Sequence, residues 1–158
     1  MFYYSYDGTF EGLLSVIFEV YERKAWPDKI TSERQVQPGL FATHVPVTTN
    51  EEKAGRVWRG LLRKISASAG VQLYKVFLSE LPDMEMIIYQ YIKLALASEV
   101  NIEENFAADC VRLVAQINKQ IFREAHRMEA FVRFQKTGDN LFYAGIEPDF
   151  NILPLLQK

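Results

Sequence analysis

The chain has 158 residues, of which 49% are hydrophobic and 24% charged, with 18 Lys and Arg against 20 Asp and Glu. This length and apolar content predict a single folded domain over residues 1–158 and exclude a disordered chain. The net charge of −2 excludes a protein that coats polyanions over its whole surface. It permits a local basic patch, because salt screens exposed charges beyond about 10 Å.

Turn residues, caps and prolines divide the N-terminal part into four predicted segments. In chain order these are a strand over Phe2–Tyr6, a helix from Thr9 to about Lys24, a loop over residues 27–39 and a strand over Leu40–Thr48. Thr9 has the hydroxyl that caps a helix, and the residue before Pro27 disfavours helical backbone. Pro46 lacks a backbone N–H, which places the second strand at a sheet edge or ends it there.

Four helices and a hairpin are predicted in the remainder. In chain order these are a helix from about Asn50 to Ser66, a short helix over Val71–Leu81, a helix over residues 83–98, a long helix from about Asn105 to Arg127 or Met128, and a hairpin of Ala130–Phe134 with Leu141–Ile146. Helix 83–98 is apolar on most sides, as is typical of a buried central helix. We therefore expect a mainly helical α+β domain with a small antiparallel sheet that includes the C-terminal hairpin.

The single cysteine and the two chain ends bear on location. Cys110 cannot form an intramolecular disulfide, which fits a reducing compartment. The N-terminus lacks the pattern of a signal peptide, and the apolar runs are too short to span a membrane. We expect a cytoplasmic protein with no membrane partner. The apolar residues of the C-terminal segment EPDFNILPLLQK lack an obvious partner, which leaves open that the chain is truncated at its C-terminus.

Several catalytic signatures are absent from the sequence. Asp7–Gly12 has two glycines but neither the Lys-Ser/Thr of a phosphate loop nor the third glycine of a dinucleotide fingerprint. No G-x-S-x-G elbow occurs. One Cys and two His cannot hold an iron–sulfur cluster, and we predict no metal site and no cofactor. Cys110 is predicted to be a small core residue.

The main remaining feature is a basic face on the long helix. It begins before the stretch REAHRMEAFVRF (Arg123–Phe134) and continues into it. At 100° per residue, five side chains share the side opposite the apolar face: Arg112, Lys119, Arg123, His126 and Arg127. Cations in the last helical turn also suit the helix dipole, so a solvated surface is the structural alternative.

The functional interpretation is that this basic face contacts the phosphates of a nucleic acid. A second basic stripe on helix 50–66 can border the same groove, and the hairpin adds Arg133 and Lys136. The predicted nucleic-acid-binding residues are Arg56, Arg63, Arg112, Lys119, Arg123, Arg127 and Arg133. The aromatic residues of the hairpin can stack on bases or pack in the core.

Three residues are weak candidates for catalysis. Histidine ordinarily titrates near neutrality, so His126 can act as an acid or base with Asp7 or Glu124 as its partner. The structural alternative for His126 is a hydrogen-bonded histidine at a helix end. The structural alternative for Asp7 is a turn residue before a helix. Glu124 lies at the flank of the apolar face; if it is buried, it should be paired with an arginine.

Motifs far apart in the chain resemble a bacterial family associated with DNA metabolism and DNA repair. They are YDGTFEGLL (Tyr6–Leu14) followed by FEVYE (Phe18–Glu22), then REAHRM (Arg123–Met128), AFVRF (Ala130–Phe134) and IEPDFN (Ile146–Asn151). The resemblance implies a domain of unknown function that acts with a radical-SAM protein and is fused in some bacteria to a uracil-DNA glycosylase. It transfers no catalytic residue, and it implies that the cofactors of such partners belong to other polypeptides. It also implies a family member that continues beyond residue 158.

These observations favour a non-catalytic accessory module that binds DNA or one of these partners. The first alternative is an enzyme acting on DNA or nucleotides through His126 and a nearby carboxylate. The second is a protein-binding scaffold only, with the apolar tail Phe150–Leu156 as its contact surface. The choice between DNA and RNA, the lesion and the oligomeric state stay open.

Overall fold

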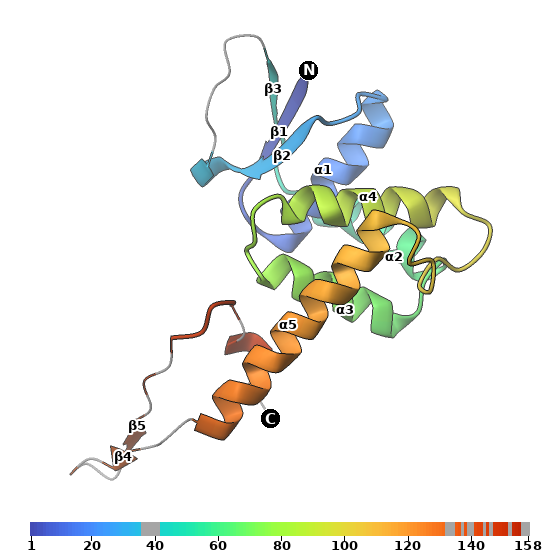
Figure 1. Ribbon diagram of the computed structural model, residues 1–158. Coiled ribbons are helices and arrows are strands. Elements are labelled where there is room, and N and C mark those ends of the chain that lie inside the picture. Colours follow the sequence, from blue (N-terminus) through green and yellow to red (C-terminus); the bar gives the residue numbers. More distant parts are fainter. Residues whose placement is uncertain are drawn as a thin grey trace.

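The computed structural model describes residues 1–35, 42–131, 135–136, 138, 141–143, 145, 147–151 and 153–155. Its elements are β1 (Phe2–Tyr6), α1 (Phe10–Arg23), β2 (Lys29–Ser32), the 3-10 helix η1 (Glu33–Gln35), β3 (Thr43–Pro46), α2 (Glu51–Leu62), α3 (Ala67–Leu78), α4 (Met84–Ala97), α5 (Asp109–Phe131), β4 (Gln135–Lys136), β5 (Phe142–Tyr143) and the 3-10 helix η2 (Leu153–Leu155). The fold is α+β and mainly helical, as predicted. Figure 1 shows the β1–β3 sheet at one end of the molecule and the last turns of α5 at the other.

The main sheet is parallel, so the prediction of an antiparallel sheet is wrong for these strands. Its strand order is β2-β1-β3, and Tyr4 of β1 lies opposite Ile30 of β2 and Val45 of β3. The crossover helix α1 returns the chain to the starting end of β1, which is how two consecutive strands become parallel. Among the described strands, antiparallel pairing is confined to β4 and β5. A C-terminal hairpin is therefore present, but β4 lies beyond the predicted first strand Ala130–Phe134, and β5 lies within the predicted second strand.

The boundaries depart from the predictions where a tertiary contact decides them. The predicted loop over residues 27–39 contains β2 and η1, because Ile30 is buried beside the central strand. The third predicted helix starts earlier, since the Ser66 hydroxyl caps α3 at Ala69. The strand expected from residue 130 is still α5 at residues 130–131, and residues 132–134 lie outside the described part of the chain.

The predicted edge position of the second strand is confirmed. β3 is an edge strand, and Pro46 is its last residue. Residues 40–41, with which the predicted strand begins, are not among the described residues.

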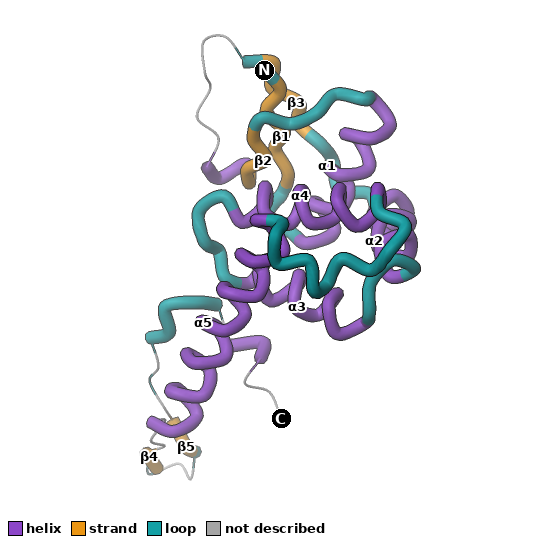
Figure 2. Tube along the Cα trace, turned by 45° about the vertical axis from the view of Figure 1, so that its right-hand side comes forward, coloured by secondary structure: helices purple, strands orange, loops and turns teal. Residues whose placement is uncertain are grey.

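The core lies where α1 and α4 meet the sheet, and α4 is its central helix, as its all-round apolar sequence predicts. Ile88 and Ile92 of α4 are fully buried, as are Leu13 and Ile17 of α1. α5 packs on α3 and α4, and the second half of α5 projects beyond them in both views (Figures 1 and 2). The C-terminal segment covers part of that half, where Ile121 and Glu124 are buried.

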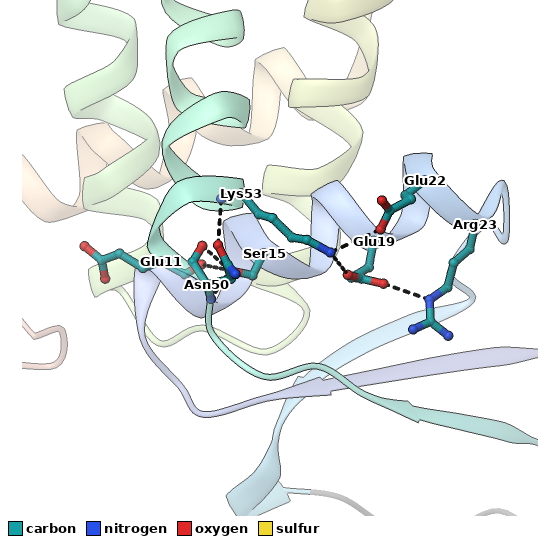
Figure 3. Close-up of polar contacts among 7 residues, drawn as sticks. All are labelled: Glu11, Ser15, Glu19, Glu22, Arg23, Asn50 and Lys53. Carbon is teal, nitrogen blue, oxygen red and sulfur yellow. Dashed lines mark hydrogen bonds and ion pairs between the residues drawn. The ribbon is translucent and has the colours of Figure 1, made fainter.

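A polar network joins α1 to α2 (Figure 3). The backbone N–H of Asn50 donates to the Ser15 hydroxyl at 3.0 Å, and that hydroxyl lies 3.2 Å from the Asn50 carbonyl oxygen. Lys53 Nζ is 2.6 Å from a Glu19 oxygen and 3.1 Å from a Glu22 oxygen. The hydrogen bond from Lys53 lowers the pKa of Glu19. These contacts hold the N-terminal half of α2 beside α1.

Candidate functional site

The exposed face of α5 carries the cations that the helical spacing predicts. Arg112, Lys119, Arg123 and Arg127 are all exposed, and the apolar side chains on the opposite face are buried against α3 and α4. This division follows from the apolar residues recurring every three or four positions, which gives a helix one buried face. α5 therefore presents one basic face to solvent.

Two of these cations are not held by neighbouring carboxylates. Arg112 is paired with Asp109, with 2.6 Å between Nη2 and Oδ1. Lys119 and Arg123 have no ion pair or hydrogen bond within the described part of the chain. They lie one turn apart, at positions i and i+4. Like charges at this spacing destabilise an isolated helix by about 0.2–0.5 kcal/mol, so helix formation does not explain the pair.

An exposed aromatic pair lies beside the two cations. The ring of Phe122 is parallel to the imidazole of His126, with centroids 6.2 Å apart and planes 1° apart. Phe122 is 70% exposed, so it contributes little to the core. At 100° per residue, Phe122 and His126 lie about 60° and 20° to one side of the direction in which Lys119 points, and Arg123 lies about 40° to the other side. Phe122 was missed in the sequence; the signal was an aromatic residue that falls on the polar side of an amphipathic helix.

The fourth cation, Arg127, has a structural task. Its guanidinium contacts the carboxylate of Glu124, which is 6% exposed, and lies 3.3 Å from Asp149 Oδ2. The Asp149 backbone N–H donates to the same glutamate at 3.2 Å. The expectation that a buried Glu124 would be paired with an arginine is confirmed. This contact also joins REAHRM to EPDF, two motifs separated in sequence.

The basic residues of α2 lie in a different layer from α5. α2 packs on α1 and α4, whereas α5 packs on α3 and α4. The guanidinium of Arg56 lies 5.1 Å from the ring centroid of Phe18, and Arg63 is exposed just after the helix. The contacts of α2 and α5 thus give no support to a single groove bordered by both stripes. Arg133 lies outside the described residues.

Asp7 is held in a closed turn at the carboxyl end of β1. Its Oδ1 accepts hydrogen bonds from the Thr9 backbone N–H at 2.9 Å and the Thr9 hydroxyl at 2.7 Å, and its Oδ2 accepts one from the Thr49 hydroxyl at 2.6 Å. Burial alone raises the pKa of Asp7, but the bonds from Thr49 and Thr9 together hold it below its ordinary value. The Thr9 hydroxyl in turn caps α1 at Gly12. Asp7 thus ties the start of α1 to the segment that follows β3.

The structure does not bring the three catalytic candidates together. Asp7 lines two cavities, of about 540 and 550 Å³, and neither is lined by His126 or Glu124. His126 is exposed on α5, and Glu124 is engaged with Arg127. The larger cavity, at the carboxyl ends of β1 and β2, has a buried carboxyl of its own.

That buried carboxyl belongs to Glu85, which accepts a hydrogen bond from the Tyr6 hydroxyl at 3.1 Å. Burial raises the pKa of Glu85 and also that of Tyr6. Asn151, from the last resemblance motif, lines the same cavity and donates to Glu80 at 3.3 Å. The motif that begins at Tyr6 and the motif that ends at Asn151 therefore meet at this cavity.

Two classes of site are not found among the described residues. No helix there is long and apolar enough to cross a bilayer. No cluster of three or more His, Cys, Asp or Glu side chains there is arranged to hold a metal ion.

Residues 82–158 match the model of a family described as a domain of unknown function, DUF4130. The matched range contains α4, α5 and the motifs REAHRM and IEPDFN, and it leaves out YDGTFEGLL. No curated protein and no solved structure matches the chain.

Proposed function

We propose that the chain is a nucleic-acid-binding accessory module of DNA repair or DNA metabolism, and that the exposed face of α5 contacts the nucleic acid. The observation that carries this proposal is the exposed Phe122–His126 pair beside Lys119 and Arg123 on the same helix. Aromatic faces stack on unpaired bases, and cations beside them neutralise the phosphates. A projecting helix with both groups on one face suits this role.

The local charge of α5 matters more here than the net charge of the chain. Screening limits the reach of exposed charges to about 10 Å, so the acidic residues of distant elements have little effect on this face. Lys119 and Arg123 can contact phosphates without first breaking an ion pair to any residue that the structure describes. Arg112 would exchange its exposed partner Asp109 for a phosphate at small cost.

The biological setting rests on the family resemblance. The motifs YDGTFEGLL and REAHRM suggest a DNA-repair or DNA-metabolism system. A radical-SAM protein or a uracil-DNA glycosylase domain is the protein partner that this resemblance implies. In such a system this chain would supply nucleic-acid contact, and the partner would supply the cofactor and the reaction.

Fluorescence anisotropy with a labelled oligothymidylate and with a DNA duplex tests the proposal. Replacing Lys119 and Arg123 together by glutamate is expected to lower affinity by about tenfold or more. The matched control replaces Arg56 on α2 and Arg63 just after it by glutamate, which changes the net charge equally. The control is expected to retain most of the affinity, because α2 and α5 belong to different layers.

Two further readouts sharpen the test. Phe122→Ala should weaken binding to the single strand more than to the duplex, because only unpaired bases can stack on the ring. The affinity of the wild-type chain should fall as salt rises, since phosphate contacts release counterions. Absence of binding at low salt, or equal losses in the two double variants, would contradict α5 as the contact surface.

A further inference from the structure

An open apolar groove lies between the N-terminal parts of α1 and α2, on elements other than α5. It has a volume of about 540 Å³. Its apolar lining is supplied by Phe10, Leu14, Ala54, Gly55 and Trp58. Leu14 and Ala54 are buried, whereas Phe10 and Trp58 are only partly buried. The groove therefore has a closed apolar floor and aromatic walls that remain accessible.

The apolar surface continues from the groove over α3. The ring of Phe10 makes edge contacts with Trp58 at 5.5 Å and with Tyr74 at 5.3 Å between centroids. Gly70 lets α3 approach closely, because a Cβ at this position would lie 3.1 Å from the Trp58 ring. Tyr74 is 39% exposed and Val71 is 53% exposed. Contiguous exposed apolar surface of this kind marks interaction sites in soluble proteins.

Carboxylates line the rim of this groove. Asp7, Glu11 and Glu51 all contribute to its lining. Glu11 and Glu51 are exposed and have no ion pair in the described part of the chain. Figure 3 shows the Glu11 side chain directed away from Lys53 and its ion pairs. The rim therefore keeps negative charge that neighbouring cations do not neutralise.

The acidity of the rim has a structural origin. Acidic residues in the first turn stabilise a helix through its dipole, and Glu11 and Glu51 occupy the first turns of α1 and α2. The hydrogen bond from Thr49 to Asp7 holds these two helix starts side by side. The carboxylates of Glu11 and Glu51, each of which stabilises its own helix, consequently lie at the same apolar groove. Farther along α2, the Arg59 guanidinium lies over Gly55.

We propose that this groove docks a segment of a partner protein, in which a bulky apolar side chain is flanked by Lys or Arg. The apolar side chain would pack against Phe10 and Trp58, and the flanking cations would pair with Glu11 and Glu51. Charge complementarity selects this occupant: the rim repels nucleic acid and acidic peptides alike. The inference stands on the groove alone, so it does not depend on nucleic-acid binding by α5.

A phage-displayed library of short random peptides, selected on the immobilised full chain, provides the first test. The enriched peptides are expected to share an aromatic or aliphatic residue with Lys or Arg nearby. Their affinity is then measured by the fluorescence of Trp58 in a Trp26→Phe background. Enrichment of acidic peptides, or of peptides without an apolar residue, would overturn the proposal.

Gly55→Leu blocks the groove without touching its floor. A Cβ at Gly55 meets only the end of the flexible Arg59 side chain, so the variant should fold. We expect it to weaken peptide binding at least about tenfold. Glu11→Gln with Glu51→Gln should also weaken it, whereas Glu52→Gln, in the same first turn but outside the groove lining, should not. Unchanged affinity in the Gly55→Leu variant would place the peptides elsewhere and refute the proposal.

A second copy of this chain is the alternative occupant of the groove, because the basic face of α5 is also complementary to the acidic rim. Light scattering, which measures molar mass in solution, distinguishes the two occupants. The wild-type chain is expected to remain a monomer at concentrations where the selected peptides bind. Self-association that Gly55→Leu abolishes would show that a second copy occupies the groove, and the partner-protein proposal would then be wrong.

Discussion

Replacing Gly12 by alanine is expected to destabilise the fold, although alanine normally strengthens a helix. Gly12 lies inside α1, where alanine is better than glycine by about 0.8–1.0 kcal/mol. A Cβ at this position, however, would lie 2.3 Å from Asp7 Oδ1 and 2.9 Å from the Thr49 hydroxyl. The carboxylate must move, and it then loses two or three hydrogen bonds worth about 1 kcal/mol each. Subtracting the helix gain leaves a net loss of about 1–2 kcal/mol in the free energy of unfolding.

Urea unfolding followed by circular dichroism measures this change. Gly60→Ala on α2 is the matched control, since a Cβ there meets nothing within 4 Å. The control should stabilise the chain by about 0.4–1 kcal/mol. A double-mutant cycle adds a sharper test: with Asp7→Ala already present, Gly12→Ala should cost much less. If Gly12→Ala proves as stabilising as Gly60→Ala, the close approach of Asp7 to α1 does not determine the stability of this turn.

Two further predictions concern the contribution of charged residues to stability. The pKa of Asp7 is lower in the folded chain than in the unfolded chain. The stability that Asp7 contributes should therefore be complete at neutral pH and be lost as the pH falls from the unfolded pKa through the folded pKa. Urea unfolding midpoints measured across acidic pH should show this loss, and the loss should be smaller in the Asp7→Asn variant. Arg127→Ala should lower the free energy of unfolding by about 1–3 kcal/mol, because it leaves the buried Glu124 carboxylate without its cation. The control Arg123→Ala should change the free energy of unfolding by less than about 0.5 kcal/mol. Equal urea midpoints for the two variants would contradict a structural role for Arg127.

The nucleic-acid test therefore uses Lys119 with Arg123 and leaves Arg127 intact. Reversing Arg127 would place a third negative charge beside the carboxylates of Glu124 and Asp149. A loss of binding in that variant could then come from disturbed packing of the C-terminal segment. Sequence spacing alone groups Arg123 and Arg127 together, and the contact with Asp149 separates their roles.

Local signals in the sequence determined most of the helices. Thr9, Asn50 and Ser66 each cap a helix through a hydroxyl or amide side chain that accepts a backbone hydrogen bond three residues later. The cap at Thr9 is predictable. The capping box of Thr49 with Glu52 predicts a helix that starts at about Asn50, but Asn50 is itself the cap, because the Thr49 hydroxyl bonds Asp7. Ser66 falls in a predicted break between helices. Helical periodicity also determined which cations share the exposed face of α5, because residues three or four positions apart lie on the same side.

Tertiary structure alone decided the sheet and the state of the site. β2 has four residues, too few for a periodic signal, and it forms because the backbone of β1 offers it hydrogen bonds. Strand direction depends on how α1 packs, which no stretch of a few residues specifies. In the same way, Asp149, 22 residues farther along the chain, reaches Arg127 and adds to its contact with Glu124, whereas Arg123 has no ion pair within the described part of the chain. Spacing along a helix fixes which side chains share a face, but their partners come from segments that only folding brings near.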